Sequence, residues 1–200
     1  VRMVIVNQIA RESLKDIKAL SKQEIFAMCE ELWQADYLEE SVVACTWAES
    51  LHKQYEPADF KVFEHWVYDY LTNWADCDTL CNHTIGNFVM MYPEYIRELK
   101  KWTKSEMYLV RRAAAVTLII PARKGLFLND IFEIADLLLS DKEDLVQKGY
   151  GWMLKAASQA HPEAVYKYVL QKRAAMPRKE LRYDIEKLSP EMRANAMKKP

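Results

Sequence analysis

The stretch NWADCD, residues 73–78, places a tryptophan and an aspartate four residues apart, Trp74 and Asp78. On an α-helix this spacing puts both side chains on one face. A large ring at a helix start would normally turn into a core, and an acid there would normally be a cap. Trp74 and Asp78 are therefore either ordinary features of a helix start or the functional end of this protein.

A second tryptophan and several cations follow further along the chain. Arg111 and Arg112 occur in LVRRAAAV, and Lys148 and Trp152 occur in VQKGYGWMLK. Other basic residues that could contact an anionic partner are Lys104, Arg178 and Arg182. If the helices that carry these side chains are neighbours, tryptophans, an acid and several cations meet in one groove.

Each of these residues also has a purely structural interpretation. Trp74 could fill the seam between two helix pairs, and Asp78 could simply favour the dipole of a helix in its first turn. Asp76 is the more natural helix cap by position. Arg112 could pair with a surface acid, which is usually worth under about 1 kcal/mol.

Two of only four glycines, Gly149 and Gly151, lie beside Trp152 inside a predicted helix. Each costs about 1 kcal/mol relative to alanine at such a position. Close packing of neighbouring backbones would explain them, and so would close approach of a ligand.

The composition predicts a soluble helical protein. With 200 residues the chain suits one domain, 1–200, and the 4 glycines and 7 prolines argue against an all-β fold. No apolar run approaches the length of a membrane span, and no signal peptide is visible, so the default compartment is the cytoplasm. The first residue is Val1 rather than methionine, which is compatible with a helical segment upstream.

Charge is divided unevenly along the chain. Residues 1–100 hold nine basic and seventeen acidic residues, a net charge of −8. Residues 101–200 hold nineteen basic and twelve acidic residues, a net charge of +7. This asymmetry favours a polyanionic partner on the C-terminal side, although chance clustering on solvated faces would give the same numbers.

The four cysteines, Cys29, Cys45, Cys77 and Cys81, do not form a Cys-x-x-Cys pair. Together with His83, Cys77 and Cys81 lack both a fourth ligand and the spacing of a zinc site. We therefore predict buried free thiols, no metal and no cofactor.

Helical patterns cover almost the whole chain. Ser21 can cap a helix that continues past Trp33, with Glu24 completing a capping box, and Ser105 can cap another. The other predicted helices are 41–55, 57–70, 76–92, 93–102, 128–139, 141–160, 162–172, 178–188 and 190–199, with the helix from Ser105 reaching residue 120.

These helices form pairs whose first members begin near residues 21, 57, 93, 128 and 162. A period of about 35 residues is typical of helical solenoids of the HEAT class. We expect an all-α, HEAT-like superhelical array of antiparallel helix pairs, with an ordinary helical bundle as the alternative. The second helix of each pair should line the concave face.

Four segments, NWADCDTLC, LVRRAAAVTLI, DLVQKGYGWMLKAAS and LRYDIEKL, resemble the DNA alkylation repair glycosylases of the AlkD type. The resemblance extends from VNQIARE near the N-terminus to about Leu188. In that family a Trp, an Asp four residues later, an Arg on a following second helix and a further Trp form the site. Trp74, Asp78, Arg112 and Trp152 occupy these places, with Arg111 adjacent to Arg112.

The resemblance implies hydrolysis of the N-glycosidic bond of N3- or N7-alkylated purines in duplex DNA by a monomer, without a metal. The alkylated base is already cationic and leaves easily, so the enzyme must chiefly stabilise a sugar with oxocarbenium character. Asp78 would do so, two tryptophan faces would contact the cation, and Arg112 and Lys148 would contact phosphates. These residues should then meet in one concave cleft.

A non-catalytic helical-repeat module that binds DNA or a protein is the alternative function. Some relatives keep the fold without glycosylase activity, but they tend to lack the tryptophan–aspartate set. The family usually has a further helix ahead of the segment where this chain begins, so part of the DNA-binding face is expected upstream.

Overall fold

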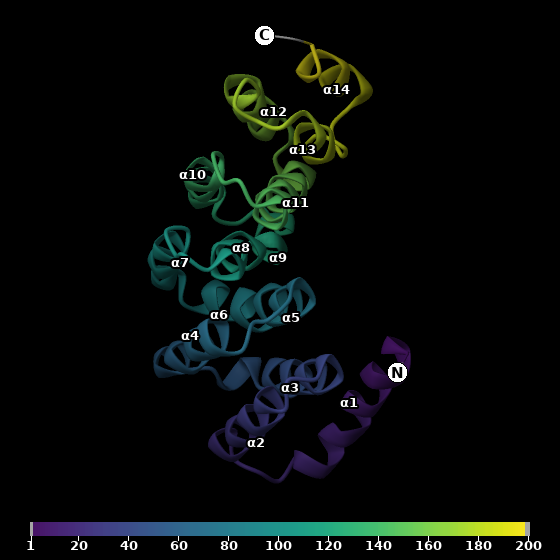
Figure 1. The fold of residues 1–200 in the computed structure, drawn as a ribbon, viewed down its shortest axis with the longest axis vertical. Helices are drawn as coiled ribbons and strands as arrows, with labels where there is room; N and C mark the ends of the chain where they lie inside the picture. Colours follow the sequence, from purple (N-terminus) through teal and green to yellow (C-terminus); the bar gives the residue numbers. More distant parts are fainter. Residues whose placement is uncertain (1, 199–200) are drawn as a thin grey trace. The chain divides into compact units, whose positions relative to one another are not determined.

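The computed structural model describes residues 2–198, and these residues form helices joined by short loops, without a β-strand among them (Figure 1). None of the helices in this range is long and apolar enough to cross a membrane. The chain divides after Tyr92 into two compact units, 1–92 and 93–200. The expectation of a single domain stays a prediction.

The first unit is a set of paired helices in which α2 packs on α3, and α3 also packs on α1 and α5. Its α-helices are α1 (Met3–Ile17), α2 (Lys22–Gln34), α3 (Leu38–Ser50), α4 (Phe60–Asp69), α5 (Trp74–Thr79) and α6 (Gly86–Met91). Short 3-10 segments lie at His52–Gln54 and Pro57–Asp59, and a π-helical segment, η3 (Leu80–Ile85), joins α5 to α6.

The second unit is organised around α11, which packs against helices on both sides of it in the sequence. Its α-helices are α7 (Ile96–Trp102), α8 (Tyr108–Val116), α9 (Ile119–Arg123), α10 (Leu128–Leu138), α11 (Asp144–Ala160), α12 (Pro162–Lys172), α13 (Arg178–Asp184) and α14 (Pro190–Ala196). A 3-10 segment at Pro93–Tyr95 precedes α7. Direct contacts of α11 are with α8, α9, α10, α12 and α13.

The predicted all-α fold is confirmed, and it is consistent with a HEAT-like array of helix pairs. The first members of the pairs begin at Lys22, Leu128 and Pro162, and at the 3-10 segments that start with Pro57 and Pro93, in agreement with a spacing of about 35 residues. The capping box at the start of α2 is also present, because the Ser21 hydroxyl accepts from the Glu24 N–H and the Glu24 carboxylate accepts from the Ser21 N–H at 2.7 Å.

Several predicted helix boundaries were wrong. The helix predicted over 41–55 begins at Leu38 and ends at Ser50. Ser105 does not cap α8, since its hydroxyl accepts from the Met107 N–H at 3.2 Å and the helix begins only at Tyr108. The helix predicted from residue 141 begins at Asp144 instead.

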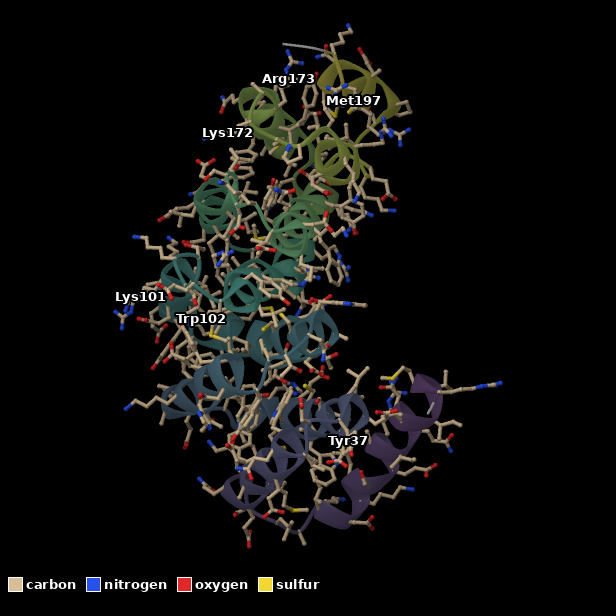
Figure 2. All side chains as sticks on the ribbon, viewed as in Figure 1. Tyr37, Lys101, Trp102, Lys172, Arg173 and Met197 are labelled. Carbon is tan, nitrogen blue, oxygen red and sulfur yellow. The ribbon has the colours of Figure 1, made fainter. Side chains whose placement is uncertain are left out.

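The last two helices are also shorter than predicted, ending at Asp184 and Ala196; residue 199 lies outside the described part of the chain. Two arginines hold the final helix by its carbonyl groups. Arg173 donates to the Asn195 carbonyl at 3.2 Å and Arg178 donates to the Met197 carbonyl at 2.7 Å; Figure 2 labels Arg173 and Met197 in this region.

Aromatic rings form the core of the first unit. Phe26 meets Phe63 and Trp66 edge-on, with ring centroids 5.7 and 5.8 Å apart, and Phe63 meets Phe88 at 5.7 Å. Edge-to-face contacts of this kind add about 0.5–1.5 kcal/mol beyond the area that they bury. This core ties α2 and α4 to α6 and thereby fixes the helix that begins at Trp74.

Candidate functional site

The helix that carries Trp74 and Asp78 begins at an asparagine cap. The Asn73 side-chain oxygen accepts from the backbone N–H groups of Ala75 at 2.9 Å and Asp76 at 3.1 Å. Asp76 was predicted to be the cap, and this prediction was wrong, because Asn73 satisfies the first free N–H groups of the helix. Trp74 is consequently the first residue of the helix.

Trp74 is 55% exposed, which distinguishes it from the rest of the tryptophans. Four of the others are buried and Trp152 is half-buried. The four buried tryptophans are Trp33, Trp47, Trp66 and Trp102. An exposed ring at a helix start contributes little to the core, so the structure does not use Trp74 to fill a seam.

Asp78 lies one turn after Trp74 and is half-buried, while the neighbouring acid Asp76 is buried. Burial raises the pKa of the Asp76 carboxyl, and hydrogen bonds from Ser41 and Asn73 offset part of that rise. Asp78 is therefore the acid of this helix that remains partly accessible beside the exposed ring.

Directly after Asp78 the helix widens into the π-helical segment η3. The Gly86 N–H donates to the carbonyl of Cys81, five residues earlier, and His83 Nδ1 lies 3.4 Å from the Glu49 carboxylate on α3. A π-helical turn inside an α-helix is uncommon and occurs often at functional sites. Here it follows the candidate acid without a break in the helix.

Arg111, in the second unit, is held by protein acceptors. Its guanidinium donates to the Asp141 carboxylate at 2.6 and 3.3 Å and to the carbonyls of Ser105 and Glu106 at 2.9 Å. Burial alone would raise the pKa of Asp141, but the hydrogen bonds from Arg111 and from the Glu143 N–H lower it below its ordinary value. Asp141 lies ahead of α11, which begins at Asp144, and pairs with Arg111 from there.

Arg112 is only 5% exposed. It donates to the Leu145 carbonyl on α11 and passes beside Gly149, where a Cβ atom would lie 3.3 Å from the arginine Cγ. This placement differs from the expectation that one of the two adjacent arginines faces DNA, because both guanidinium groups are directed to acceptors within the protein.

The two glycines of α11 make room for side chains. Gly149 faces Arg112 of α8, and Gly151 faces Asp184 of α13, whose Oδ1 would lie 2.3 Å from a Cβ atom at residue 151. Of the two explanations considered from the sequence, close packing is the one that the structure supports, although the packed groups are chiefly side chains rather than backbones.

Trp152 and Lys148 lie four residues apart on α11 and are both partly exposed. Lys148 pairs with the Asp144 carboxylate one turn earlier, and Lys179 of α13 lies 3.6 Å from the same carboxylate. Cation and ring therefore occupy one face of α11, next to the start of α13.

The remaining predicted DNA contacts are on the surface of the second unit. Lys104, Arg178 and Arg182 are exposed, and Arg178 also holds the Met197 carbonyl. Arg182 lines a shallow surface hollow together with Arg193. Because these side chains are already on the surface, they can contact an anionic partner directly.

The structure thus assembles the predicted residues in two groups. Trp74 and Asp78 share one helix of the first unit, and Arg112, Lys148 and Trp152 are grouped at α11 in the second. Their meeting in a single concave cleft stays a prediction. All four cysteines are buried and free, as predicted, and no cluster of three metal-binding side chains occurs within residues 2–198.

Sequence reasoning missed three residues that shape these groups: Asn73, Asp141 and Asp184. Asn73 could have been found, since asparagine is among the strongest N-cap residues and directly precedes the tryptophan. Asp141 and Asp184 gave no local signal, because their roles depend on partners that lie about thirty residues away in the chain.

Comparison with known proteins relates the chain to a protein family and its fold to a solved structure. A family model described as DNA alkylation repair enzyme matches residues 1–188. A solved structure described as a predicted DNA alkylation repair enzyme from Enterococcus faecalis has a similar fold, with a TM-score of 0.82 at 17% sequence identity, covering 95% of this chain and 87% of that chain. None of the curated proteins searched matches the chain.

Proposed function

We propose that this chain, which belongs to the DNA alkylation repair enzyme family, is a monofunctional glycosylase that removes N3- or N7-alkylated purines from duplex DNA. The observation that carries the proposal is the exposure of Trp74 one helical turn from a partly accessible Asp78. Four of the other five tryptophans are buried, so an exposed tryptophan beside an acid is a candidate for substrate contact.

The proposed chemistry follows from the charge of the substrate. An alkylated purine carries a positive charge and leaves with the electron pair of the glycosidic bond, while positive charge develops on the sugar. The Asp78 carboxylate offsets that charge and orients the water that attacks the sugar. The faces of Trp74 and Trp152 contact the cation, at roughly 0.5–2 kcal/mol each.

Charged residues of the second unit take two different roles in this proposal. Lys104, Lys148, Arg178 and Arg182 are exposed or partly exposed and contact the DNA backbone. Arg112 instead acts as a positioning residue, because it holds the Leu145 carbonyl and packs on Gly149 in the helix that carries Trp152. Arg111 holds Asp141 and the start of α8.

The charge distribution supports DNA as the partner. Residues 93–200 contain twenty-one basic and fourteen acidic residues, a net charge of +7. Residues 1–92 contain seven basic and fifteen acidic residues, a net charge of −8. The proposed phosphate contacts all belong to the basic unit. Binding that depends on them should weaken steeply as salt is added.

Base release from methylated duplex DNA tests the proposal. The wild type should release 3-methyladenine or 7-methylguanine, and Asp78→Asn should abolish release while leaving DNA binding in place. Asp16→Asn, which changes an exposed acid on α1, is the matched control and should retain activity.

A folded wild type that binds duplex DNA and releases no methylated base would falsify the glycosylase proposal. Salt-dependent binding without release would instead identify a DNA-binding module, and the absence of DNA binding would point to a protein partner.

A further inference from the structure

The surface hollow between α13 and α14 is lined by two exposed arginines. Its volume is about 330 Å³, near the lower end of the range for ligand sites. Arg182 comes from α13 and Arg193 from α14, and neither side chain makes an ion pair or a hydrogen bond within residues 2–198. The other lining residues are Ile185, Glu186, Pro190, Ala194 and Met197. Two arginines therefore border a hollow whose remaining walls are largely apolar.

The acid that lines the hollow, Glu186, does not cancel the charge of the arginines. Glu186 pairs with Lys155 of α11 and lies 3.6 Å from the Lys187 ammonium group. The hydrogen bond from Lys155 lowers the pKa of the Glu186 carboxyl, so this group is ionised at neutral pH and its charge is offset by the two lysines. The hollow keeps a net positive charge, and its ligand should be an anion.

The shape of the hollow is fixed in the free protein, because α14 is tied to α12 and α13 near its C-terminal end (Figure 1). Arg178 donates to the Met197 carbonyl at 2.7 Å, and Arg173 donates to the Asn195 carbonyl at 3.2 Å. The Asn195 amide also donates to the Tyr166 hydroxyl on α12. A site that is already ordered loses less conformational entropy when its ligand binds.

A row of cations leads from the exposed face of α11 to the hollow. Lys148 of α11 and Lys179 of α13 both lie at the Asp144 carboxylate. Lys179 and Arg182 are three residues apart, so they are neighbours on the surface of α13, and Arg182 shares the hollow with Arg193. All of these cations belong to the second unit. A row of separate cations suits a polyanion better than a single small anion.

We propose that Arg182 and Arg193 hold one phosphate of the DNA backbone in the hollow between α13 and α14. This inference rests on DNA as the partner, as proposed above, and it does not require base release. Each guanidinium presents its N–H donors in a planar fork that matches two phosphate oxygens. The phosphate lies between the two arginines, and the adjoining deoxyribose packs on the apolar wall formed by Ile185, Ala194 and Met197.

The contribution of α14 lies outside the segment that the family model matches. That match ends at residue 188, and α14 begins at Pro190. Arg193 therefore adds to the phosphate site a cation from beyond the matched segment. In this way α14 extends the DNA-binding surface proposed for α11 and α13.

Arg193→Gln tests the contribution of α14, because glutamine keeps a long polar side chain and removes the charge. The melting temperature should stay close to that of wild type, since the side chain is on the surface. Affinity for duplex DNA with an uncleavable abasic-site analogue should fall about three- to tenfold, and the slope of log affinity against log salt should become shallower by about one. Arg97→Gln, the same change of charge at an exposed arginine of α7, is the matched control and should bind as wild type does.

Duplexes in which one phosphate at a time is replaced by a neutral methylphosphonate identify the phosphate that is held. The wild type should lose affinity at each position where a cation contacts the backbone. At one of these positions the replacement should cost both Arg193→Gln and Arg182→Gln less than about twofold, because the contact is already broken in these variants. Arg97→Gln should show the wild-type pattern at every position.

Wild-type affinity and salt dependence in Arg193→Gln would overturn the inference. A weakened Arg193→Gln that keeps the wild-type methylphosphonate pattern would also overturn it, because the arginine would then act only through net charge. The binding measurements need no base release, so a wild type that binds DNA without releasing a base contradicts the glycosylase function alone. A wild type that binds no duplex DNA overturns both.

Discussion

The Asp184 carboxylate occupies the space that a side chain at Gly151 would need. A Cβ atom at residue 151 would lie 2.3 Å from Asp184 Oδ1, a distance that real Cβ atoms do not show. The α11–α13 contact therefore requires glycine at this position, even though glycine weakens the interior of a helix. Gly151 and Asp184 have to be considered as a pair.

Gly151→Ala should destabilise the protein. Alanine gains about 1 kcal/mol of helix propensity, but overpacking against Asp184 costs about 1–3 kcal/mol or more. In the Asp184→Ala background the same change should become stabilising, because the clashing carboxylate is gone. Urea unfolding of the two single variants and the double variant measures the coupling, and purely additive effects would contradict the proposed clash.

Asp184→Asn should stabilise the protein at neutral pH. The carboxylate is fully buried, and neither oxygen has a hydrogen-bond partner in the described part of the chain. Burial, followed by the nearby Glu180, raises the pKa of Asp184 well above 3.8. The folded state therefore binds more protons than the unfolded state above about pH 4, and stability falls as pH rises from there toward the folded-state pKa.

Unfolding free energies measured across pH 4–8 test this prediction, because the amide of the Asp184→Asn variant does not titrate. The wild type should lose stability relative to the variant as pH rises in that window, and the two curves should converge at acidic pH. Parallel curves would show that the Asp184 carboxyl does not carry the pH dependence.

His65 should contribute stability that disappears at alkaline pH. Its Nε2 lies 2.9 Å from Glu30 and its Nδ1 lies 2.6 Å from Asp69, so the protonated ring bridges two carboxylates. The hydrogen bond to Glu30, then that to Asp69, raises the pKa of His65 above 6.5. The contribution is complete below pH 6.5 and is lost as pH rises through the folded-state pKa.

His65→Gln should remove this dependence of stability on pH. The effect should be small and should shrink in high salt, because the His65 side chain is 46% exposed. Thermal unfolding of both proteins between pH 6 and pH 9, at low and at high ionic strength, provides the measurement. A wild type whose stability does not change in this range would contradict the prediction.

Trp66→Ala should cost much more stability than Trp74→Ala, which should chiefly reduce base release. Trp66 is fully buried in the aromatic core, so its loss should cost about 3–5 kcal/mol. Trp74 is mostly exposed, so its loss should cost under about 1 kcal/mol while reducing base release. A large loss of stability in Trp74→Ala would show that Trp74 is a structural residue and would contradict the prediction.

Helix pairing was predictable because it depends on local patterns. Three of the five first members begin at prolines, Pro57, Pro93 and Pro162, and the first is preceded by the expected capping box of Ser21 with Glu24. The exception is the start of α5, where Asn73 and Asp76 are both good caps by residue type and Asn73 is the residue that caps the helix.

The environment of the arginines could not be predicted, because it depends on distant residues. Arg112 looks like a surface cation in LVRRAAAV, yet it is buried against Gly149, thirty-seven residues later. Arg111 is likewise held by Asp141, thirty residues later. Periodicity identifies the helix face on which a side chain lies and does not identify the partner that meets it.

The π-helical turn between Leu80 and Ile85 also has a consequence for comparing relatives. Such a turn holds one residue more than the α-helical turn that it replaces, so it is equivalent to a single inserted residue. Deleting one residue there would restore an ordinary helix and rotate Trp74 and Asp78 by about 100° relative to the core residues Phe88 and Val89. An alignment of related chains without a gap at this turn would therefore pair each of these residues with a neighbour that faces another direction.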